Sequence, residues 1–155
     1  PLIFSAEGRR REASSAGMAY GTRLHAALDW LSSGGEAGRP PQGIPAPDWP
    51  AFHNAAQAIL EAPQLKAFFD PAGYLRALNE AEFALPDGSV GRIDRLVELA
   101  DGFWVLDYKS GRRDAALLET YRAQMEDYQA AVMALFPGKT VRCGLIFSDG
   151  DLLEI

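Results

Sequence analysis

The chain has 155 residues, of which 48% are hydrophobic and 23% are charged, so its composition fits one folded domain and excludes a disordered chain. Its 21 acidic residues outnumber 15 basic ones, and the net charge of −6 argues against a basic nucleic-acid interface over the whole surface. The single cysteine excludes an internal disulfide, a structural zinc site and a cysteine-held iron–sulfur cluster. No apolar run is long enough to cross a membrane, and Arg9-Arg10-Arg11 follow the first apolar residues, whereas a signal peptide begins with its charges. We therefore expect a cytoplasmic protein with no membrane partner.

The N-terminal part of the chain is predicted to be helical. Between residues 17 and 33 the apolar residues recur about every 3.6 residues, and Gly34-Gly35 end this helix. Gly and Pro are frequent between residues 34 and 47, which is typical of a loop. Two more helices are expected: one that Asp48 can cap, with Pro50 in its first turn and Pro63 at its end, and a short one through Phe69.

The apolar pattern then changes to that of strands. Leu78–Leu85 alternates, with Phe83 and Leu85 on one face and Glu80 and Glu82 on the other. The later elements are strands Val90–Leu99 and Phe103–Lys109, a helix over residues 115 to 135 that Pro137-Gly138 end, a strand Val141–Phe147 and a last strand after Asp149-Gly150. This order predicts a single α/β domain over residues 1–155, with helices packed on a sheet whose first three strands form an antiparallel meander.

The strand that ends in Asp107-Tyr108-Lys109 carries the first candidate site. Asp107 and Lys109 are two residues apart, so their side chains point to one face, while Trp104, Leu106 and Tyr108 point to a core on the other. A carboxylate binds a hard divalent cation, and a lysine beside it stabilises the charge that builds up on a phosphate. The alternative is a surface ion pair, worth less than about 1 kcal/mol.

A second acid, Asp94, lies on the preceding strand, on the face expected for Arg92 and Leu96. Its spacing from Asp107 allows a hairpin to bring the two strands side by side. Two acids on adjacent strands, followed by a lysine, can bind one or two Mg²⁺ ions for phosphodiester hydrolysis. The alternative is a solvated strand face on which Arg92 and Arg95 alternate with the acid.

Two helices offer further candidates. His25 lies on the first helix, and histidine is a good ligand for Mn²⁺ or a transition metal, although a lone histidine is more often a surface residue, as we expect for His53. Gln124 and Tyr128 are four residues apart and share one face of the helix over residues 115 to 135. That glutamine can bind a phosphate or hold the lysine, and the alternative is an ordinary amphipathic helix.

These pieces, in this order, resemble the PD-(D/E)xK nuclease superfamily and, within it, the RecB-like branch. The chain is similar to the C-terminal nuclease domain of AddA-type helicase–nuclease subunits. The family pattern is a G-x-x-x-H helix, an E-x-x-F strand, G-x-I-D, D-Y-K-[ST]-G and Q-x-x-x-Y. In this chain the pieces are Gly21–His25, Glu80–Phe83, Gly91–Asp94, Asp107–Gly111 and Gln124–Tyr128.

The resemblance implies a restriction-endonuclease-like core with a mixed sheet flanked by helices. It also implies Mg²⁺ as the cofactor, with Mn²⁺ as a substitute and no iron–sulfur cluster. The implied metal ligands are His25, Asp94, Asp107 and the backbone carbonyl of Tyr108; the implied catalytic residues are Asp94, Asp107 and Lys109; the implied supporting or substrate-binding residues are Glu80, Gln124 and Tyr128.

The function implied is metal-dependent hydrolysis of DNA by the exonuclease of a double-strand break repair helicase–nuclease of the AddAB or RecBCD kind. The expected partners are DNA single strands or ends, the rest of a longer helicase polypeptide and an AddB-like subunit. Because the chain is acidic, we expect most of the DNA affinity to reside in those partners. Two alternatives are a non-catalytic scaffold or DNA-guiding module of the same fold, and an unrelated α/β domain. The presence of His25, Asp94, Asp107 and Lys109 together favours catalysis.

Overall fold

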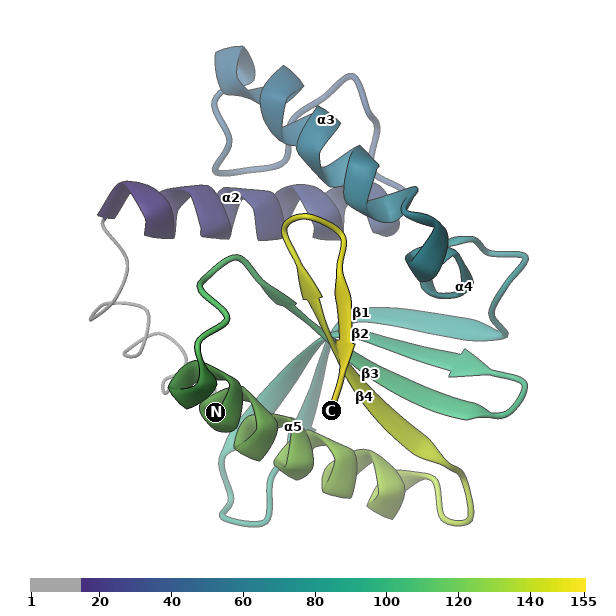
Figure 1. Cartoon of the computed structure of the whole chain (residues 1–155). Helices are drawn as coiled ribbons and strands as arrows, with labels where there is room; N and C mark the ends of the chain where they lie inside the picture. The colour runs from purple at the N-terminus through teal and green to yellow at the C-terminus, as the bar shows by residue number, and fades with distance from the viewer. Residues whose placement is uncertain (1–14) are drawn as a thin grey trace.

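The helices and strands form three layers, with the sheet in the middle (Figure 1). The computed structural model describes residues 15–155, so Arg9-Arg10-Arg11 lie outside the described residues. Helices α2, α3 and α4 cover one face of the sheet, and α5 covers the other. The elements are α2 (Ser15–Ser32), α3 (Trp49–Leu60), α4 (Lys66–Phe69), β1 (Arg76–Ala84), β2 (Val90–Leu99), β3 (Gly102–Lys109), α5 (Ala115–Leu135), β4 (Val141–Phe147) and β5 (Leu152–Glu154), with short 3₁₀ turns at Ala46–Asp48 and Pro63–Leu65.

The sheet is mixed and has the strand order β1-β2-β3-β4-β5. Strands β1, β2 and β3 form the predicted antiparallel meander, and β4 and β5 form another antiparallel pair. Strand β4 runs parallel to β3, because α5 carries the chain back across the sheet between them. The expected fold class is therefore confirmed. None of the described helices is long and apolar enough to cross a membrane.

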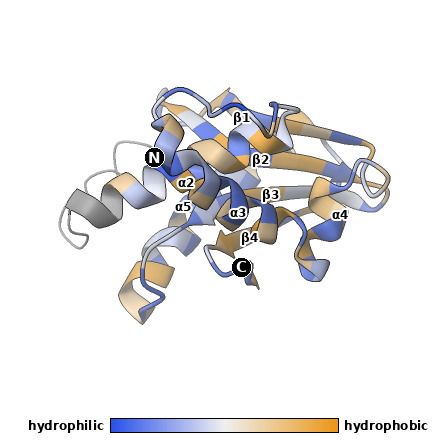
Figure 2. Ribbon diagram, turned by 90° about the horizontal axis from the view of Figure 1, so that it is seen from above, coloured by the Kyte–Doolittle hydropathy of each residue, from blue (hydrophilic) through white to orange (hydrophobic). Residues whose placement is uncertain are grey.

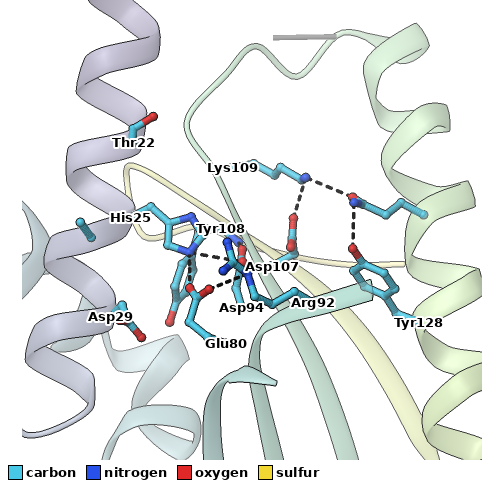
Figure 3. A pocket seen from close by; sticks show the side chains of 12 residues that line it. Thr22, His25, Asp29, Glu80, Arg92, Asp94, Asp107, Tyr108, Lys109 and Tyr128 are labelled. Carbon is cyan, nitrogen blue, oxygen red and sulfur yellow. Dashed lines mark hydrogen bonds and ion pairs between the residues drawn. The ribbon is translucent and has the colours of Figure 1, made fainter. Parts of the chain in front are cut away.

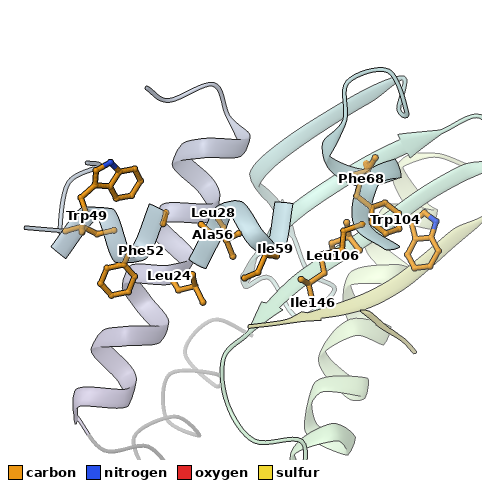
Figure 4. Packing of buried hydrophobic residues seen from close by; sticks show 14 residues of the cluster. Leu24, Leu28, Trp49, Phe52, Ala56, Ile59, Phe68, Trp104, Leu106 and Ile146 are labelled. Carbon is orange, nitrogen blue, oxygen red and sulfur yellow. The ribbon is translucent and has the colours of Figure 1, made fainter. Parts of the chain in front are cut away.

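Two hydrophobic cores fill the spaces between the layers. The first core lies between the sheet and the α2–α4 layer (Figure 4), and it takes Trp104 and Leu106 from β3 as predicted. The second core lies between the sheet and α5, and it takes Phe103 and Val105 from the opposite face of β3. Figure 2 shows hydrophobic residues along the strands at the centre of the molecule. Strand β3 is thus buried on both faces, which holds its C-terminal end rigidly in place.

One local prediction is wrong. Asp48 stands at the N-cap of α3, but its side chain makes no capping hydrogen bond. Its own backbone is helical, because it ends the preceding 3₁₀ turn, and its carboxylate lies 3.5 Å from Arg23. His53 lies partly exposed at the surface, and its ring packs edge-on against Trp49 with 5.6 Å between the ring centroids.

The regular alternation predicted for β1 is also broken, and the break occurs at Glu80. Ala77 packs against the first core, whereas Ala81 and Phe83 pack against the second. Residues two or four apart in a regular strand share a face, so the strand exchanges its two faces between these residues. Glu80 adopts a φ of +53°, a left-handed conformation that is uncommon outside glycine and explains the exchange.

Strand β2 makes the same exchange across from Glu80. Val97 belongs to the first core and Ile93 to the second. These residues are four positions apart, so in a regular strand they would share one face. The β1–β2 pairing holds at Asn79↔Arg95 and again at Ala81↔Ile93, with an interruption between these two pairs. Glu80 and Asp94 occupy that interruption, which frees both side chains from the sheet faces.

Candidate active site

A pocket of about 340 Å³ opens where the three layers meet (Figure 3). Helix α2 forms one wall, the middle of β1, the first half of β2 and the C-terminal end of β3 form the floor, and α5 forms the opposite wall. The lining residues are Thr22, His25, Ala26, Asp29, Glu80, Arg92, Asp94, Asp107, Tyr108, Lys109, Gln124 and Tyr128. The sequence-predicted site residues all lie in this one pocket.

His25 lies between two carboxylates that come from different strands. Its Nε2 atom is 3.1 Å from Oε1 of Glu80 on β1 and 3.2 Å from Oδ1 of Asp94 on β2. One ligand atom from each of these three residues lies within 4.8 Å of the others. The alternative of a lone surface histidine is therefore wrong. Glu80, for which only a supporting role was predicted, contacts His25 directly and belongs to the same group of three as Asp94.

Asp107 lies beside Asp94 but outside that group of three. The pairing of β2 with β3 runs as far as Arg95↔Leu106, so the next residues along, Asp94 and Asp107, lie across from each other, close enough to shift each other's pKa. The amide of Tyr108 donates a hydrogen bond of 2.8 Å to Oδ2 of Asp94. Asp94 is thus bonded to its neighbours on α2 and β3, and the alternative of a solvated strand face is wrong, since Asp94 is only 8% exposed.

Lys109 is held on two sides. Its Nζ atom lies 2.6 Å from Oδ2 of Asp107, and both side chains are at least nine-tenths buried, so this is not a surface ion pair. Nζ also donates to Oε1 of Gln124 at 3.3 Å, and Nε2 of Gln124 donates to the hydroxyl of Tyr128 at 3.1 Å. The ring of Tyr121 lies 4.3 Å below the ammonium group. Helix α5 therefore holds the lysine, as one of the two predicted roles of Gln124 requires.

The buried charges shift one another's pKa values. Burial lowers the pKa of His25, but hydrogen bonds and charges from Asp94 and Glu80 outweigh burial and raise it to about 10. Burial opposes the ionisation of Asp94, yet His25, the contact with Asp107 and the Tyr108 amide hold the pKa of Asp94 below its usual range. Burial and the charge of Asp94 raise the pKa of Asp107 to about 7, against the opposing effect of Lys109. The pKa values of the two acids differ because Asp94 has His25 as its partner, whereas Asp107 faces the negative charge of Asp94.

Two motif glycines lie where the elements around the pocket pack closely. A Cβ atom at Gly21 would lie 2.3 Å from Oγ of Ser110, so this glycine lets α2 approach the chain that follows Lys109. A Cβ atom at Gly91 would lie 2.9 Å from the ring of Phe83 and 3.2 Å from the ring of Tyr128. The absence of a side chain at these two glycines lets elements that carry separate motifs pack closely against each other.

The sequence reasoning missed Thr22 and Asp29 as pocket residues. Thr22 precedes His25 by three residues on α2 and Asp29 follows it by four, which places all three on one face of the helix. That spacing was the signal that could have identified them. Arg92 was noted only as a nearby charge, and it pairs with Glu80 at 2.7 Å.

The donor set fits one divalent cation. Carboxylate oxygens suit Mg²⁺ and Mn²⁺, and an imidazole nitrogen suits Mn²⁺ in particular. His25, Glu80 and Asp94 present such atoms to a common point, and Asp107 can join them because it already contacts Asp94. In the structure these atoms bond to one another, which balances their charges.

Comparison with known proteins agrees with this arrangement. The sequence profile of the PD-(D/E)XK nuclease superfamily matches residues 3–151. The chain belongs to the PD-(D/E)XK nuclease superfamily. The alternative of an unrelated α/β domain is therefore wrong, and membership supports hydrolysis of nucleic acid as the activity of the pocket.

One curated relative matches this PD-(D/E)XK chain over part of its length. The chain is 43% identical over 62 residues to an ATP-dependent helicase/nuclease subunit from Moorella thermoacetica. The match covers 40% of the chain and 4% of that protein, so the chain spans a small fraction of its relative.

Proposed function

We propose that the chain is a metal-dependent DNA nuclease domain that hydrolyses phosphodiester bonds, as the exonuclease of a helicase–nuclease in double-strand break repair. The observation that carries the proposal is the pocket in which His25, Glu80, Asp94, Asp107 and Lys109 meet. The superfamily match supports the nuclease activity, and the name of the Moorella relative supports a helicase–nuclease parent.

In this proposal His25, Asp94 and Asp107, together with the Tyr108 carbonyl, hold the cation. Mg²⁺ is the proposed ion and Mn²⁺ its substitute, because hard oxygen ligands predominate. The ion supplies a Lewis acid that polarises the phosphate and lowers the pKa of a water molecule. His25 contributes a neutral nitrogen, which requires release of the proton it holds between Glu80 and Asp94.

Lys109 is the proposed electrostatic catalyst. Asp107 and Gln124 fix its ammonium group at the edge of the pocket, so it needs no reorganisation when negative charge builds up on the phosphate. Tyr128 orients Gln124, and through it the lysine. The proposed roles of Gln124 and Tyr128 are thus to position Lys109 and to support the DNA strand.

The proposed partners follow from charge and from the length of the relative. A net charge of −6 fits a domain that receives DNA single strands or ends from the rest of a helicase polypeptide and an AddB-like partner, instead of capturing DNA alone. The single buried cysteine is compatible with the reducing cytoplasm, which we propose as the location.

The test compares Lys109→Ala with Asp107→Ala. Lys109→Ala is expected to lower the rate of DNA hydrolysis by about 10²–10³-fold while Mn²⁺ affinity stays nearly intact, because it removes an electrostatic group and no ligand. Asp107→Ala is expected to lower both. Lys139→Ala, which changes an exposed lysine outside the pocket, is the matched control and should behave as the wild type.

The measurements are Mn²⁺ calorimetry and cleavage of single-stranded and blunt-ended DNA at saturating Mg²⁺. A wild type with no saturable cation site would support the non-catalytic scaffold instead. Full cleavage by Lys109→Ala would contradict the role given to the lysine.

A further inference from the structure

Arg92 is the pocket residue whose charge the roles above do not use. It lies on β2, two residues before Asp94, and its side chain is 40% exposed. Its Nε atom lies 2.7 Å from Oε2 of Glu80, while the other oxygen of Glu80 contacts His25. Figure 3 shows Arg92 and Glu80 reaching toward each other beside His25 and Asp94.

The contact between Arg92 and Glu80 is close but poorly aligned. The Nε atom of Arg92 is buried, yet it makes no hydrogen bond of acceptable geometry. The neighbouring Arg95 differs, because its guanidinium donates to the carbonyl of Phe68 at 2.9 Å and to Asn79 at 2.6 Å, and only 2% of the residue is exposed. Arg95 is therefore fixed in the fold, whereas Arg92 is held by charge alone.

The two basic side chains of the pocket floor also differ from each other. Lys109 is 9% exposed and is held by Asp107, Gln124 and the ring of Tyr121. Arg92 is 40% exposed, forms an ion pair with Glu80 and also interacts with the charge of Asp29. A guanidinium group presents paired donors that match phosphate oxygens. It therefore loses little interaction energy when a phosphate replaces a carboxylate as its partner.

A divalent cation would compete with Arg92 for the same carboxylate. Glu80 belongs to the group of three ligand atoms within 4.8 Å, so a cation placed there attracts the carboxylate that now holds Arg92. We propose that Arg92 contacts a phosphate of the bound DNA strand, and that Glu80 holds it in place until the cation and the DNA arrive. This inference rests on the proposed nuclease function and adds a substrate-binding residue to it.

The alternative is that Arg92 only braces Glu80 for cation binding. The two possibilities predict opposite effects of Arg92→Ala. If Arg92 is exchanged for the cation, its removal leaves Mn²⁺ affinity equal to or tighter than that of the wild type, and DNA binding becomes weaker. If Arg92 is a brace, its removal weakens Mn²⁺ binding and leaves the DNA contacts intact.

The experiment measures binding of fluorescein-labelled oligo(dT) to the full chain by anisotropy, with Ca²⁺ as the cation, over a range of salt concentrations. Mn²⁺ calorimetry and cleavage with Mg²⁺ are run in parallel. Loss of one phosphate contact on a single strand should reduce the slope of log affinity against log salt by about 0.7. We expect Arg92→Ala to show this change and about tenfold weaker DNA binding, similar for different base sequences.

Two variants complete the design. Arg142→Ala is the matched control, because Arg142 forms an ion pair with Glu154 at 2.6 Å, is 46% exposed and does not line the pocket; it should keep the wild-type slope. Arg92→Gln removes the charge but keeps a shorter polar side chain, and it repeats the measurement if Arg92→Ala does not fold.

The outcomes separate this inference from the function on which it rests. A wild type that binds Mn²⁺ and cleaves DNA, with an unchanged salt slope in Arg92→Ala, overturns the inference alone. Weaker Mn²⁺ binding by Arg92→Ala with an unchanged salt slope identifies Arg92 as a brace for Glu80, and this result also overturns the inference. A wild type that neither binds Mn²⁺ nor cleaves DNA overturns the proposed function and this inference with it.

Discussion

Asp94 and Asp107 lie across from each other at the end of the β2–β3 pairing, and both residues are buried. Asp94 has the better surroundings for a negative charge, because His25 and the Tyr108 amide both bond to it. Asp107 is only 6% exposed, and burial together with the charge of Asp94 raises its pKa. In the absence of a cation, ionisation of Asp107 therefore lowers the stability of the fold.

This arrangement predicts a pH dependence of stability. The native pKa of Asp107 is raised to about 7, whereas in the unfolded chain the same carboxyl has a pKa of about 3.9. The native state binds more protons between these values, so the free energy of unfolding falls as pH rises through this window. In metal-free buffer, Asp107→Asn should be about 1–3 kcal/mol more stable than the wild type above pH 7 and nearly equal to it below pH 4.

Urea unfolding of both proteins across this pH range, with a chelator present, measures the difference. Other titrating groups such as Asp29 are present in both proteins, so their contributions largely cancel. An Asp107→Asn protein that is less stable than the wild type above pH 7 would show that the ion pair with Lys109 outweighs the cost of burial.

At the scale of elements, helices and strands could be predicted and the exchange of faces could not. Periodicity located α5, β2 and β4 at their observed bounds, because a packed helix or strand repeats its apolar residues along the chain. The exchange at Glu80 depends on one left-handed residue that is not glycine, which leaves no pattern in the sequence. The pairing of Glu80 with Arg92, and its approach to His25, were missed for the same reason.

The packing of motif residues gives a prediction at this scale. Phe83 on β1 and Tyr128 on α5 meet edge-on with 5.3 Å between their centroids, and Gly91 on β2 leaves room for both rings. Gly91→Ala should destabilise the protein by about 1–3 kcal/mol, because an added methyl group overpacks the site. Phe83→Leu should relieve part of this effect, so the double variant should be more stable than the sum of the single effects predicts, by about 1 kcal/mol.

Thermal or urea unfolding of the three variants measures this coupling. Gly38→Ala is the control, because a Cβ atom at Gly38 meets nothing within 4 Å, and it should change stability by less than about 0.5 kcal/mol. Additive effects of Gly91→Ala and Phe83→Leu would mean that Tyr128 alone, or the backbone, determines the need for glycine.

At the scale of the whole molecule, the pocket joins all three layers. His25 comes from the α2–α4 layer, the acids come from the sheet, and Gln124 comes from α5. The order of elements and the resemblance of the motifs predicted that these residues would meet, but not which contacts they make. Those contacts depend on how α2 docks, which is set by first-core packing distributed over many residues. The proximity of Glu80 to His25, which are 55 residues apart, is one result of that docking.

Cation binding should therefore stabilise the whole fold. With free Mn²⁺ at a hundredfold excess over its dissociation constant, the free energy of unfolding should rise by about 2.7 kcal/mol, because the unfolded chain has no assembled site. For a domain of this size that increase corresponds to about 5–10 °C in Tm. Calorimetric melting with and without Mn²⁺ checks the shift. His25→Ala should abolish most of it, and an equal shift in this variant would place the cation away from α2.

The way the strands are connected also orders the steps by which the chain folds. The meander of β1, β2 and β3 consists of short hairpins, so its contacts close small loops and lose little chain entropy. Docking of α2 closes a loop of 55 residues between His25 and Glu80 and should come later. We expect higher φ-values for Ile93→Val on β2, whose side chain belongs to the second core, than for Leu28→Ala on α2 in the first core. The carboxylates of the site would then gather before its histidine, so in the partly folded chain Asp94 lacks the partner that His25 provides until α2 docks.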